Sequence, residues 1–309
     1  MSNLSLQSGV TAVITGAGSG FGLELARLGA KKGLNLVITD VQQDALDAAV
    51  AELTAAGAQV AALRGDVSRA EDVQALADLC LERFGVPNLV INNAGVAHGG
   101  LIWEHTQRDW EWVLGVNLFG VIHGLRVFTP LMLEAARKDP SYQGHMVNVA
   151  SMAGLLNSPN MGAYNVSKHA VVSLSETLYQ DLSLVTEQVH AHVLCPYFVP
   201  TGIHQSHRNR PAELRSEGKP TPSQMIAQAM STKAVTSGKV TAADTAAMVY
   251  KAVEAGQFYI YTHPQALGMV QTRLEDVVQA RNPTDPFAGK PEIGQQLRQA
   301  LREAADQQG

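Results

Sequence analysis

A tyrosine and a lysine lie four residues apart in the stretch 162–168, which reads Gly-Ala-Tyr-Asn-Val-Ser-Lys. If this stretch is helical, Tyr164 and Lys168 share one face, one turn apart. An ammonium group near a phenol stabilises the phenolate, so we expect the pKa of Tyr164 to fall below its usual value of about 10. Such a phenol can exchange a proton near neutral pH. The pair alone also fits a surface tyrosine beside a solvated lysine, so its meaning depends on its surroundings.

Short apolar runs alternate with helical patterns along most of the chain. This alternation is typical of right-handed βαβ units, which build a parallel sheet. The runs that we expect to be strands are residues 10–15, 34–39, 59–63, 88–91, 145–150, 189–194 and 257–261. The expected helices are residues 21–32, 42–56, 69–84, 110–138 and 162–186. The sequence therefore predicts an α/β fold with a doubly wound, parallel, seven-stranded Rossmann-type sheet, flanked by helices on both faces.

We expect a single domain over residues 1–309, because no Gly/Ser linker divides the chain. Two regions depart from the strand–helix alternation. Residues 202–239 are polar, with a weak helical pattern at 222–234, which indicates a substrate lid. Residues 262–309 form a C-terminal extension, with a helical pattern at 265–281 and a final helix after a turn-rich stretch at 282–291.

Composition excludes several classes of protein. The net charge of −5 gives no general attraction to nucleic acid or to anionic membranes. The two cysteines, Cys80 and Cys195, are too few for a disulfide framework and lack metal-ligand spacing. The first residues lack the features of a signal peptide, and no uninterrupted apolar run approaches membrane-spanning length. We therefore expect a cytoplasmic protein with no metal, no nucleic-acid partner and no membrane.

A glycine-rich turn follows the first expected strand, where residues 15–22 read Thr-Gly-Ala-Gly-Ser-Gly-Phe-Gly. Glycines let the backbone approach a pyrophosphate, and the next helix offers free N–H groups. Asp40 closes the second strand, where a carboxylate accepts hydrogen bonds from ribose hydroxyls and repels a 2′-phosphate. No basic residue follows it, which favours NAD over NADP. The alternative interpretation of the glycine-rich stretch is a plain turn, and that of Asp40 is a helix N-cap.

Together these motifs resemble the short-chain dehydrogenase/reductase family, in its shorter single-domain type with a C-terminal extension. The resemblance covers residues 8–202 and rests on the order and spacing of the motifs. The matched motifs are Thr15-Gly16-x-x-x-Gly20-x-Gly22, Asp66, Asn92-Asn93-Ala94-Gly95, Asn117, Ser151 and Tyr164-x-x-x-Lys168.

The resemblance implies a role for each residue of a catalytic group. Tyr164 would be the general acid or base, and Lys168 would lower its pKa and hold the nicotinamide ribose. Ser151 would hold the substrate oxygen as charge develops on it. Asn117 would position a water that links Lys168 to solvent. Plain structural roles for Ser151, as a turn residue, and for Asn117, as a polar group in a bent helix, are the alternatives.

Cofactor contacts are implied in the same way. The resemblance assigns them to Gly16, Ser19, Phe21, Gly22, Asp40, Asp66, Val67, Asn93, Ala94, Gly95, Tyr164, Lys168, Pro196, Val199 and Thr201. The family usually has a Pro-Gly pair after the sixth strand, whereas Tyr197 follows Pro196 here. The backbone at Tyr197 therefore departs from the pattern, and its ring would narrow the substrate pocket.

The substrate walls are expected from mostly apolar or aromatic segments: His98, Trp103, residues 152–161, Tyr197, Phe198 and the lid. They favour a hydrophobic or aromatic secondary alcohol or ketone. The lid also carries His204, His207, Arg208, Arg210, Arg215 and Lys219, against Glu213 and Glu217. These cations fit either an anionic substrate group or a solvated surface. His190 and His192 share a strand face and are expected to be structural.

Three functions remain open. The first is NAD-dependent interconversion of a secondary alcohol and a ketone, by proton relay and hydride transfer. The second is biosynthetic reduction of 3-oxoacyl thioesters, which an acidic chain with this tail fits poorly. The third is a non-catalytic nucleotide-binding regulator, which would not need Tyr164 and Lys168. By resemblance, we expect a homodimer or homotetramer.

Overall fold

The computed structural model describes residues 5–216 and 218–306, so Glu217 of the predicted lid and both chain ends lie outside the described residues. Its seven strands form one sheet in the order β3-β2-β1-β4-β5-β6-β7, and every neighbouring pair is parallel. The strands are β1 (Thr11–Thr15), β2 (Asn35–Asp40), β3 (Val60–Arg64), β4 (Leu89–Asn92), β5 (Gly144–Val149), β6 (Val189–Cys195) and β7 (Tyr259–Tyr261). The predicted doubly wound Rossmann-type sheet is confirmed.

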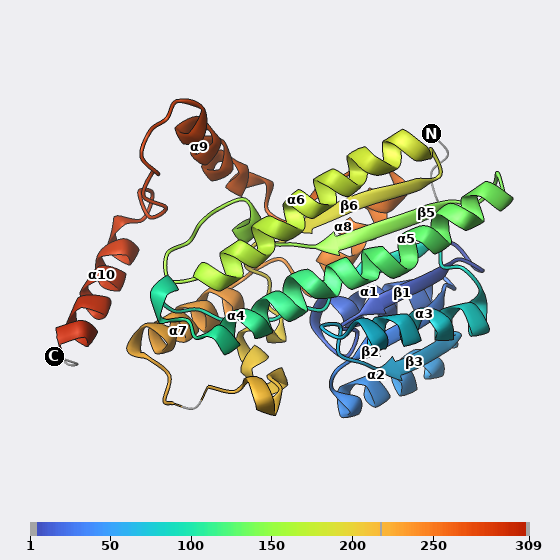
Figure 1. The fold of residues 1–309 in the computed structure, drawn as a ribbon, viewed down its shortest axis with the longest axis horizontal. Helices are drawn as coiled ribbons and strands as arrows, with labels where there is room; N and C mark the ends of the chain where they lie inside the picture. Colours follow the sequence, from blue (N-terminus) through green and yellow to red (C-terminus); the bar gives the residue numbers. More distant parts are fainter. Residues whose placement is uncertain (1–4, 217, 307–309) are drawn as a thin grey trace.

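Helices cover both faces of the sheet (Figure 1). One face carries α3 (Ala70–Phe84), α5 (Gly120–Lys138) and α6 (Gly162–Val185). The other face carries α1 (Gly20–Lys31), α2 (Gln43–Ala55) and α8 (Ala242–Glu254).

Alternate residues of the strands build two separate cores. In β1, Val13 packs with α3 and α5, whereas Ile14 packs with α1 and α8. In β4, Val90 and Ile91 divide in the same way. Because successive strand residues face opposite sides, a strand buried on both faces is mainly apolar, as the centres of β1 and β4 are.

A long helical stretch, Gln107–Lys138, contains α4 (Gln107–Leu114), a π-helical turn (Gly115–Phe119) and α5. By length and composition alone it could cross a membrane, although polar residues such as Asn117, His123 and Arg126 interrupt its apolar residues. Phe128 and Met132 of this stretch are fully buried in the core beside β5 and α3. We therefore interpret it as a core helix of the α/β fold.

The lid and the tail lie at the carboxyl end of the sheet. The lid, residues 202–239, contains the short 3-10 helices Gly202–Asn209 and Ala212–Leu214 and then α7 (Pro222–Thr236). The tail contains α9 (Leu267–Val278), which extends away from the sheet, and α10 (Pro291–Asp306), which packs against α7 (Figure 1). The 3-10 helices were not expected from the sequence.

Candidate active site

A cleft opens where the carboxyl ends of β1, β2, β4 and β5 meet the lid. This is where the strand order reverses, the usual ligand position in such sheets. The predicted residues that line it are Gly16, Ser19, Phe21, Asp40, Asp66, Val67, Asn93, Ala94, Gly95, Tyr164, Lys168, Pro196 and Thr201. Four other predicted residues, Gly22, Val199, Ser151 and Asn117, are not in this lining.

The glycine loop is held in shape by its neighbours. Gly16 has φ +65°, which favours glycine, and its backbone approaches Ala94. A Cβ on Gly22 would lie 2.1 Å from the Gly16 carbonyl oxygen, so no side chain fits there. Asn93 Nδ2 donates to the carbonyl oxygen of Thr15 at 2.8 Å, which ties the loop to the end of β4. Gly22 therefore shapes the loop and does not itself line the cleft.

Asp40 reaches from the end of β2 to the glycine loop. Its Oδ2 accepts a hydrogen bond from the Gly18 N–H at 2.9 Å, and its Oδ1 accepts one from the Gln42 N–H at 3.0 Å. One feature was missed: Arg64 pairs with Asp40 in the β2–β3 register, and its Nε donates to the Val41 carbonyl oxygen at 3.0 Å. A basic side chain therefore does lie beside Asp40. Because Arg64 is 24 residues further along the chain, no local sequence pattern indicated this contact.

Tyr164 and Lys168 lie on α6 and both line the cleft. Lys168 Nζ is 5.8 Å from the Tyr164 ring centroid and donates to the Val149 carbonyl oxygen at 2.9 Å. Burial raises the pKa of Tyr164, and a hydrogen bond with Ser151 only partly opposes this increase. The expected decrease in the pKa of Tyr164 is therefore wrong, because burial of the phenol outweighs the groups that would lower it. Burial also lowers the pKa of Lys168 to about 8.

Ser151 and Asn117 lie behind this pair. Ser151 begins a short turn after β5, and its Oγ accepts a hydrogen bond from the Ala153 N–H at 3.1 Å. Asn117 is fully buried in the π-helical turn, a feature often found at functional sites. Its Nδ2 donates to the Val96 carbonyl oxygen and to Ser167 Oγ, and its Oδ1 accepts from the Val96 N–H. Its amide therefore joins the loop after β4 to α6, and the water relay stays a prediction.

The apolar wall differs from the expected one. The residues that line it include Val96, Trp112, Val116, Ile203, Pro211 and Leu214. Trp103 is 77% exposed, and neither it nor His98 is in the lining. Tyr197 is not in this lining, and its narrowing of the substrate pocket stays a prediction. Its ring centroid lies 4.2 Å from that of Phe198 with the ring planes tilted, and its N–H donates to Thr262 Oγ1 at 3.0 Å.

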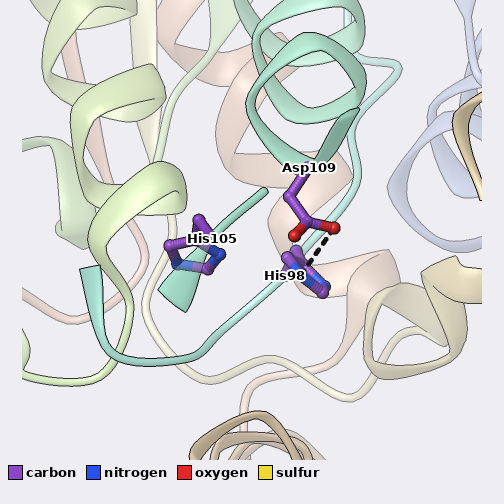
Figure 2. A group of neighbouring side chains, drawn as sticks. All are labelled: His98, His105 and Asp109. Atoms are coloured by element: carbon purple, nitrogen blue, oxygen red, sulfur yellow. Dashed lines mark ion pairs between the residues drawn. The ribbon is translucent and has the colours of Figure 1, made fainter. Parts of the chain in front are cut away.

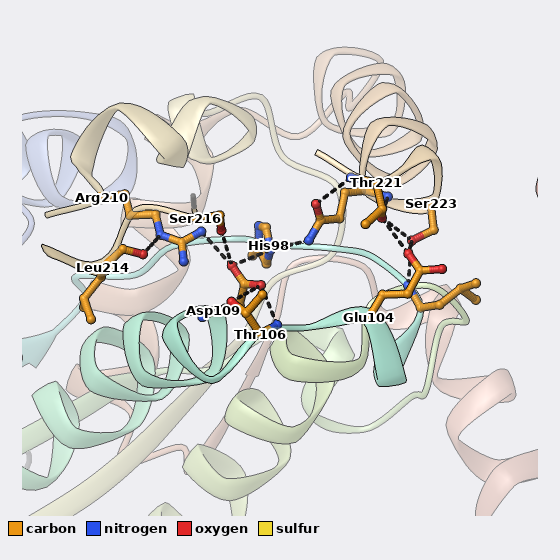
Figure 3. Close-up of polar contacts among 11 residues, drawn as sticks. His98, Glu104, Thr106, Asp109, Arg210, Leu214, Ser216, Thr221 and Ser223 are labelled. Atoms are coloured by element: carbon orange, nitrogen blue, oxygen red, sulfur yellow. Dashed lines mark hydrogen bonds and ion pairs between the residues drawn. The ribbon is translucent and has the colours of Figure 1, made fainter. Parts of the chain in front are cut away.

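A polar cluster around Asp109 lies beside this wall (Figure 3). The sequence did not indicate this cluster. Asp109 is fully buried near the start of α4, and its Oδ1 is 2.7 Å from Arg210 Nη1 and 3.2 Å from His98 Nε2. Its Oδ2 accepts hydrogen bonds from the N–H and Oγ1 of Thr106, both at 2.8 Å. Burial raises the pKa of Asp109, but hydrogen bonds from His98 and Thr106 outweigh it and hold the pKa below its usual range. The carboxylate is therefore charged and paired.

The same cluster has some features of a metal site. The ligand atoms of His98, His105 and Asp109 lie within 4.8 Å of one another (Figure 2). However, donors already occupy both oxygens of Asp109, and one of these donors is the guanidinium of Arg210. A cation would have to displace a cation, so we interpret the Asp109 cluster as an ion-pair anchor for the lid.

A second polar contact joins the lid to the loop after β4. Glu104 Oε2 accepts hydrogen bonds from Thr221 Oγ1 at 2.5 Å and from Ser223 Oγ at 2.6 Å (Figure 3). These hydroxyls belong to the residue before α7 and to its first turn. The irregular segment of the lid is therefore held at one end to α4, through Asp109, and at the other end to the loop before α4, through Glu104.

Comparison with known proteins agrees with this geometry. The family model described as short chain dehydrogenase matches residues 10–212. A short-chain dehydrogenase/reductase from Burkholderia phymatum, solved in complex with NAD, is 51% identical with a TM-score of 0.89, over 92% of this chain and 100% of that one. The chain belongs to the short-chain dehydrogenase/reductase family.

Two curated relatives also span most of the chain. The CLA biosynthesis dehydrogenase/reductase of Lactiplantibacillus plantarum is 34% identical and covers 86% of this chain and 92% of its own. The 1-deoxy-11-beta-hydroxypentalenate dehydrogenase of Streptomyces exfoliatus is 33% identical, with coverages of 86% and 87%. The protein is thus an oxidoreductase that acts on hydroxyl or keto groups with a nicotinamide cofactor.

Proposed function

We propose that this enzyme interconverts a secondary alcohol and a ketone with NAD, and that the substrate is hydrophobic or aromatic. The observation that carries the proposal is the meeting of Tyr164 and Lys168 with the glycine loop in one cleft at the reversal of strand order. A proton-transferring phenol and a dinucleotide loop in one cleft are what alcohol oxidation requires.

The glycine loop and Asp40 would hold a nicotinamide dinucleotide, which would supply the hydride-transfer chemistry between the alcohol and the ketone. Tyr164 would remove the hydroxyl proton during oxidation and return it during reduction. Ser151 would hold the substrate oxygen, consistent with its hydrogen bond to Tyr164. The positive charge of Lys168 would stabilise the phenolate once Nζ turns from the Val149 carbonyl towards the site. Asn117 would keep the loop after β4 in register with α6.

The preference for NAD rests on Asp40. Its carboxylate is at the end of β2, where it would bond the adenosine ribose and repel a 2′-phosphate. Arg64 lies close by but is not in the cleft lining. The NAD complex of the Burkholderia phymatum relative supports the same cofactor.

The proposed substrate class rests on the wall of the cleft. Trp112, Val116, Ile203, Pro211 and Leu214 offer an apolar surface, and apolar area is what a hydrophobic alcohol would cover. The Streptomyces exfoliatus relative is named a dehydrogenase of 1-deoxy-11-beta-hydroxypentalenate, a molecule that carries a hydroxyl group. That name supports oxidation of an alcohol as the reaction of this chain.

Assembly and location are also proposals. Phe119, Val166 and Tyr179, in or next to the long helices α5 and α6, are each between 44% and 48% exposed, which supports a homodimer or homotetramer through these helices. The net charge of −5 supports an enzyme that acts on small molecules rather than on nucleic acid, and we propose a cytoplasmic location for it.

The test is a screen of hydrophobic and aromatic secondary alcohols, and of the matching ketones, with NAD and NADP in parallel. We expect nicotinamide absorbance to change with NAD and the larger apolar substrates, and little change with short polar alcohols. Turnover that requires NADP, or a preference for carrier-bound 3-oxoacyl thioesters, would contradict the proposal.

A further inference from the structure

The lid brings a cation to the cleft that the proposed mechanism does not use. Arg208 lines the cleft with Ser19 and Gly20 of the glycine loop. Its guanidinium lies against Gly202, because a Cβ built there would be 3.2 Å from Arg208 Nη2. The preceding Thr201 approaches Gly20, where an added Cβ would lie 3.4 Å from the Thr201 Cβ. Arg208 thus lies across the cleft mouth from the start of α1.

Arg208 is also free to take an anionic ligand. Its Nη1 donates to Gln205 Oε1 at 3.0 Å, and this partner is neutral. Within residues 5–216 and 218–306, no carboxylate forms an ion pair with it. The charged side chains that line the cleft are Asp40, Asp66, Glu111, Lys168 and Arg208. Acidic groups outnumber basic ones, so a dianion needs a cation near its own position.

The neighbouring Arg210 fixes this part of the lid. It pairs with the buried Asp109, its guanidinium lies 5.1 Å from the Trp112 ring centroid, and its Nε donates to the Leu214 carbonyl oxygen at 2.6 Å (Figure 3). A backbone held two residues away reduces the conformational entropy that Arg208 loses when it binds. The lid therefore presents Arg208 to the cleft from a fixed base.

We infer that Arg208 is a further cofactor-binding residue, which closes the lid over the glycine loop by pairing with the pyrophosphate of the nicotinamide dinucleotide. Guanidinium groups match phosphate oxygens in charge and in fork geometry. The inference rests on the proposed function, because it needs the dinucleotide in this cleft. An anionic substrate group has the same chemistry, and the test separates the two because its probes contain no substrate.

The experiment compares Arg208→Gln and Arg208→Lys with the full-length wild-type enzyme. The matched control is Arg215→Gln, which removes a lid arginine outside the cleft lining. The dissociation constants of NADH, ADP-ribose and adenosine are measured by nicotinamide fluorescence and by competition. ADP-ribose keeps the pyrophosphate, whereas adenosine lacks it.

Arg208→Gln should raise the dissociation constants of NADH and ADP-ribose by about tenfold, the change expected for the loss of one charge-assisted hydrogen bond. Adenosine should bind as before, Arg208→Lys should recover part of the loss, and Arg215→Gln should behave as wild type. Added salt should weaken ADP-ribose binding less in Arg208→Gln than in wild type.

Unchanged ADP-ribose affinity in Arg208→Gln would overturn the inference and leave the proposed function intact. Equal weakening of adenosine would also overturn it, because the change would then act on the lid as a whole. A loss confined to the KM of an anionic substrate would assign Arg208 to the substrate instead. If wild-type enzyme bound neither NADH nor NADPH, the proposed function itself would fail.

Discussion

At the scale of single residues, the site depends on two charged groups that are held by the backbone. Lys168 donates to the Val149 carbonyl oxygen, and Asp40 accepts from the Gly18 N–H of the glycine loop. Both groups are buried, so their charge has a strong effect on whatever enters the cleft. The high pKa of Tyr164 follows from the same burial and makes the phenol a poor base until a positive charge comes close.

The first prediction concerns Asp40. Asp40→Ser should lower kcat/KM for NAD by about tenfold, because the ribose hydroxyls lose a charged hydrogen-bond acceptor. The same variant should raise kcat/KM for NADP, because the repulsion of the 2′-phosphate is removed and Arg64 lies beside the site. The measurement is kcat/KM with each cofactor.

Arg64→Gln provides the matched control for this change. In the Asp40→Ser background it should abolish the gain with NADP and leave NAD unaffected. An Asp40→Ser enzyme that keeps its full preference for NAD, with an unchanged melting temperature, would show that Asp40 serves only the loop.

At the scale of elements, two sets of polar contacts hold the lid to α4 and to the loop before it. The Asp109–Arg210 ion pair joins α4 to the irregular part of the lid, and Glu104 joins the preceding loop to the start of α7. Breaking one partner of a buried pair leaves an uncompensated charge, which costs more than the pair contributes. Arg210 therefore anchors the lid, whereas Arg208 is the arginine that we infer to bind the cofactor.

We predict that Asp109→Asn loosens the lid and lowers the free energy of unfolding by about 3 kcal/mol, because Arg210 loses its buried partner. Limited proteolysis should cut within residues 202–216 faster than in wild type. The double variant Asp109→Asn with Arg210→Met should regain part of the stability, since it removes both charges.

The control for the lid is Arg298→Gln, which removes a half-exposed ion pair on α10. It should change neither stability nor cleavage, because exposed pairs contribute little. Equal cleavage of the Asp109→Asn variant and of wild type would mean that the ion pair does not anchor the lid.

At the scale of the whole molecule, a row of histidines crosses the sheet between β5 and β6. His192 Nδ1 lies 2.6 Å from the Gln257 carbonyl oxygen, and His192 Nε2 lies 2.9 Å from His145 Nδ1. Since a carbonyl only accepts, His192 donates from Nδ1, and a neutral His192 then accepts at Nε2 from the Nδ1–H of His145. Burial lowers the pKa of His145 to about 2 and that of His192 to about 4.

We predict that this row makes the enzyme sensitive to acid. Both pKa values are lowered on folding, so the unfolded chain binds more protons below about pH 6.5. Stability is therefore complete above that pH and is lost as the pH falls towards 4. Each histidine can add a slope of up to about 1.4 kcal/mol per pH unit. Urea unfolding at several pH values measures it.

The variant His192→Gln should give a flatter dependence on pH, and replacement of the exposed His207 should leave the wild-type slope. A His192→Gln variant whose stability falls as steeply as that of wild type would assign the acid sensitivity to other groups.

The sequence was sufficient to predict what depends on local chemistry. The glycine loop and the Tyr164–Lys168 pair are short motifs, and the apolar strands are continuous runs, so the fold and most cleft residues could be named. Arg64, Trp112 and the Asp109–Arg210 pair could not. Their roles depend on strand register and on contacts between segments far apart in the chain, for which a single sequence holds no pattern. The prediction of a lowered pKa for Tyr164 was wrong for a similar reason, because that pKa depends on how deeply the fold buries the phenol.

The most direct test of the account is hydride transfer by Tyr164→Phe in a single turnover, with NADH binding measured on the same sample. The variant keeps the ring that lines the cleft but has no proton to transfer. We predict an NADH dissociation constant within about twofold of wild type and a rate reduced by at least about a thousandfold. Hydride transfer at the wild-type rate would contradict the account, because Tyr164 would then not be the proton-transferring group.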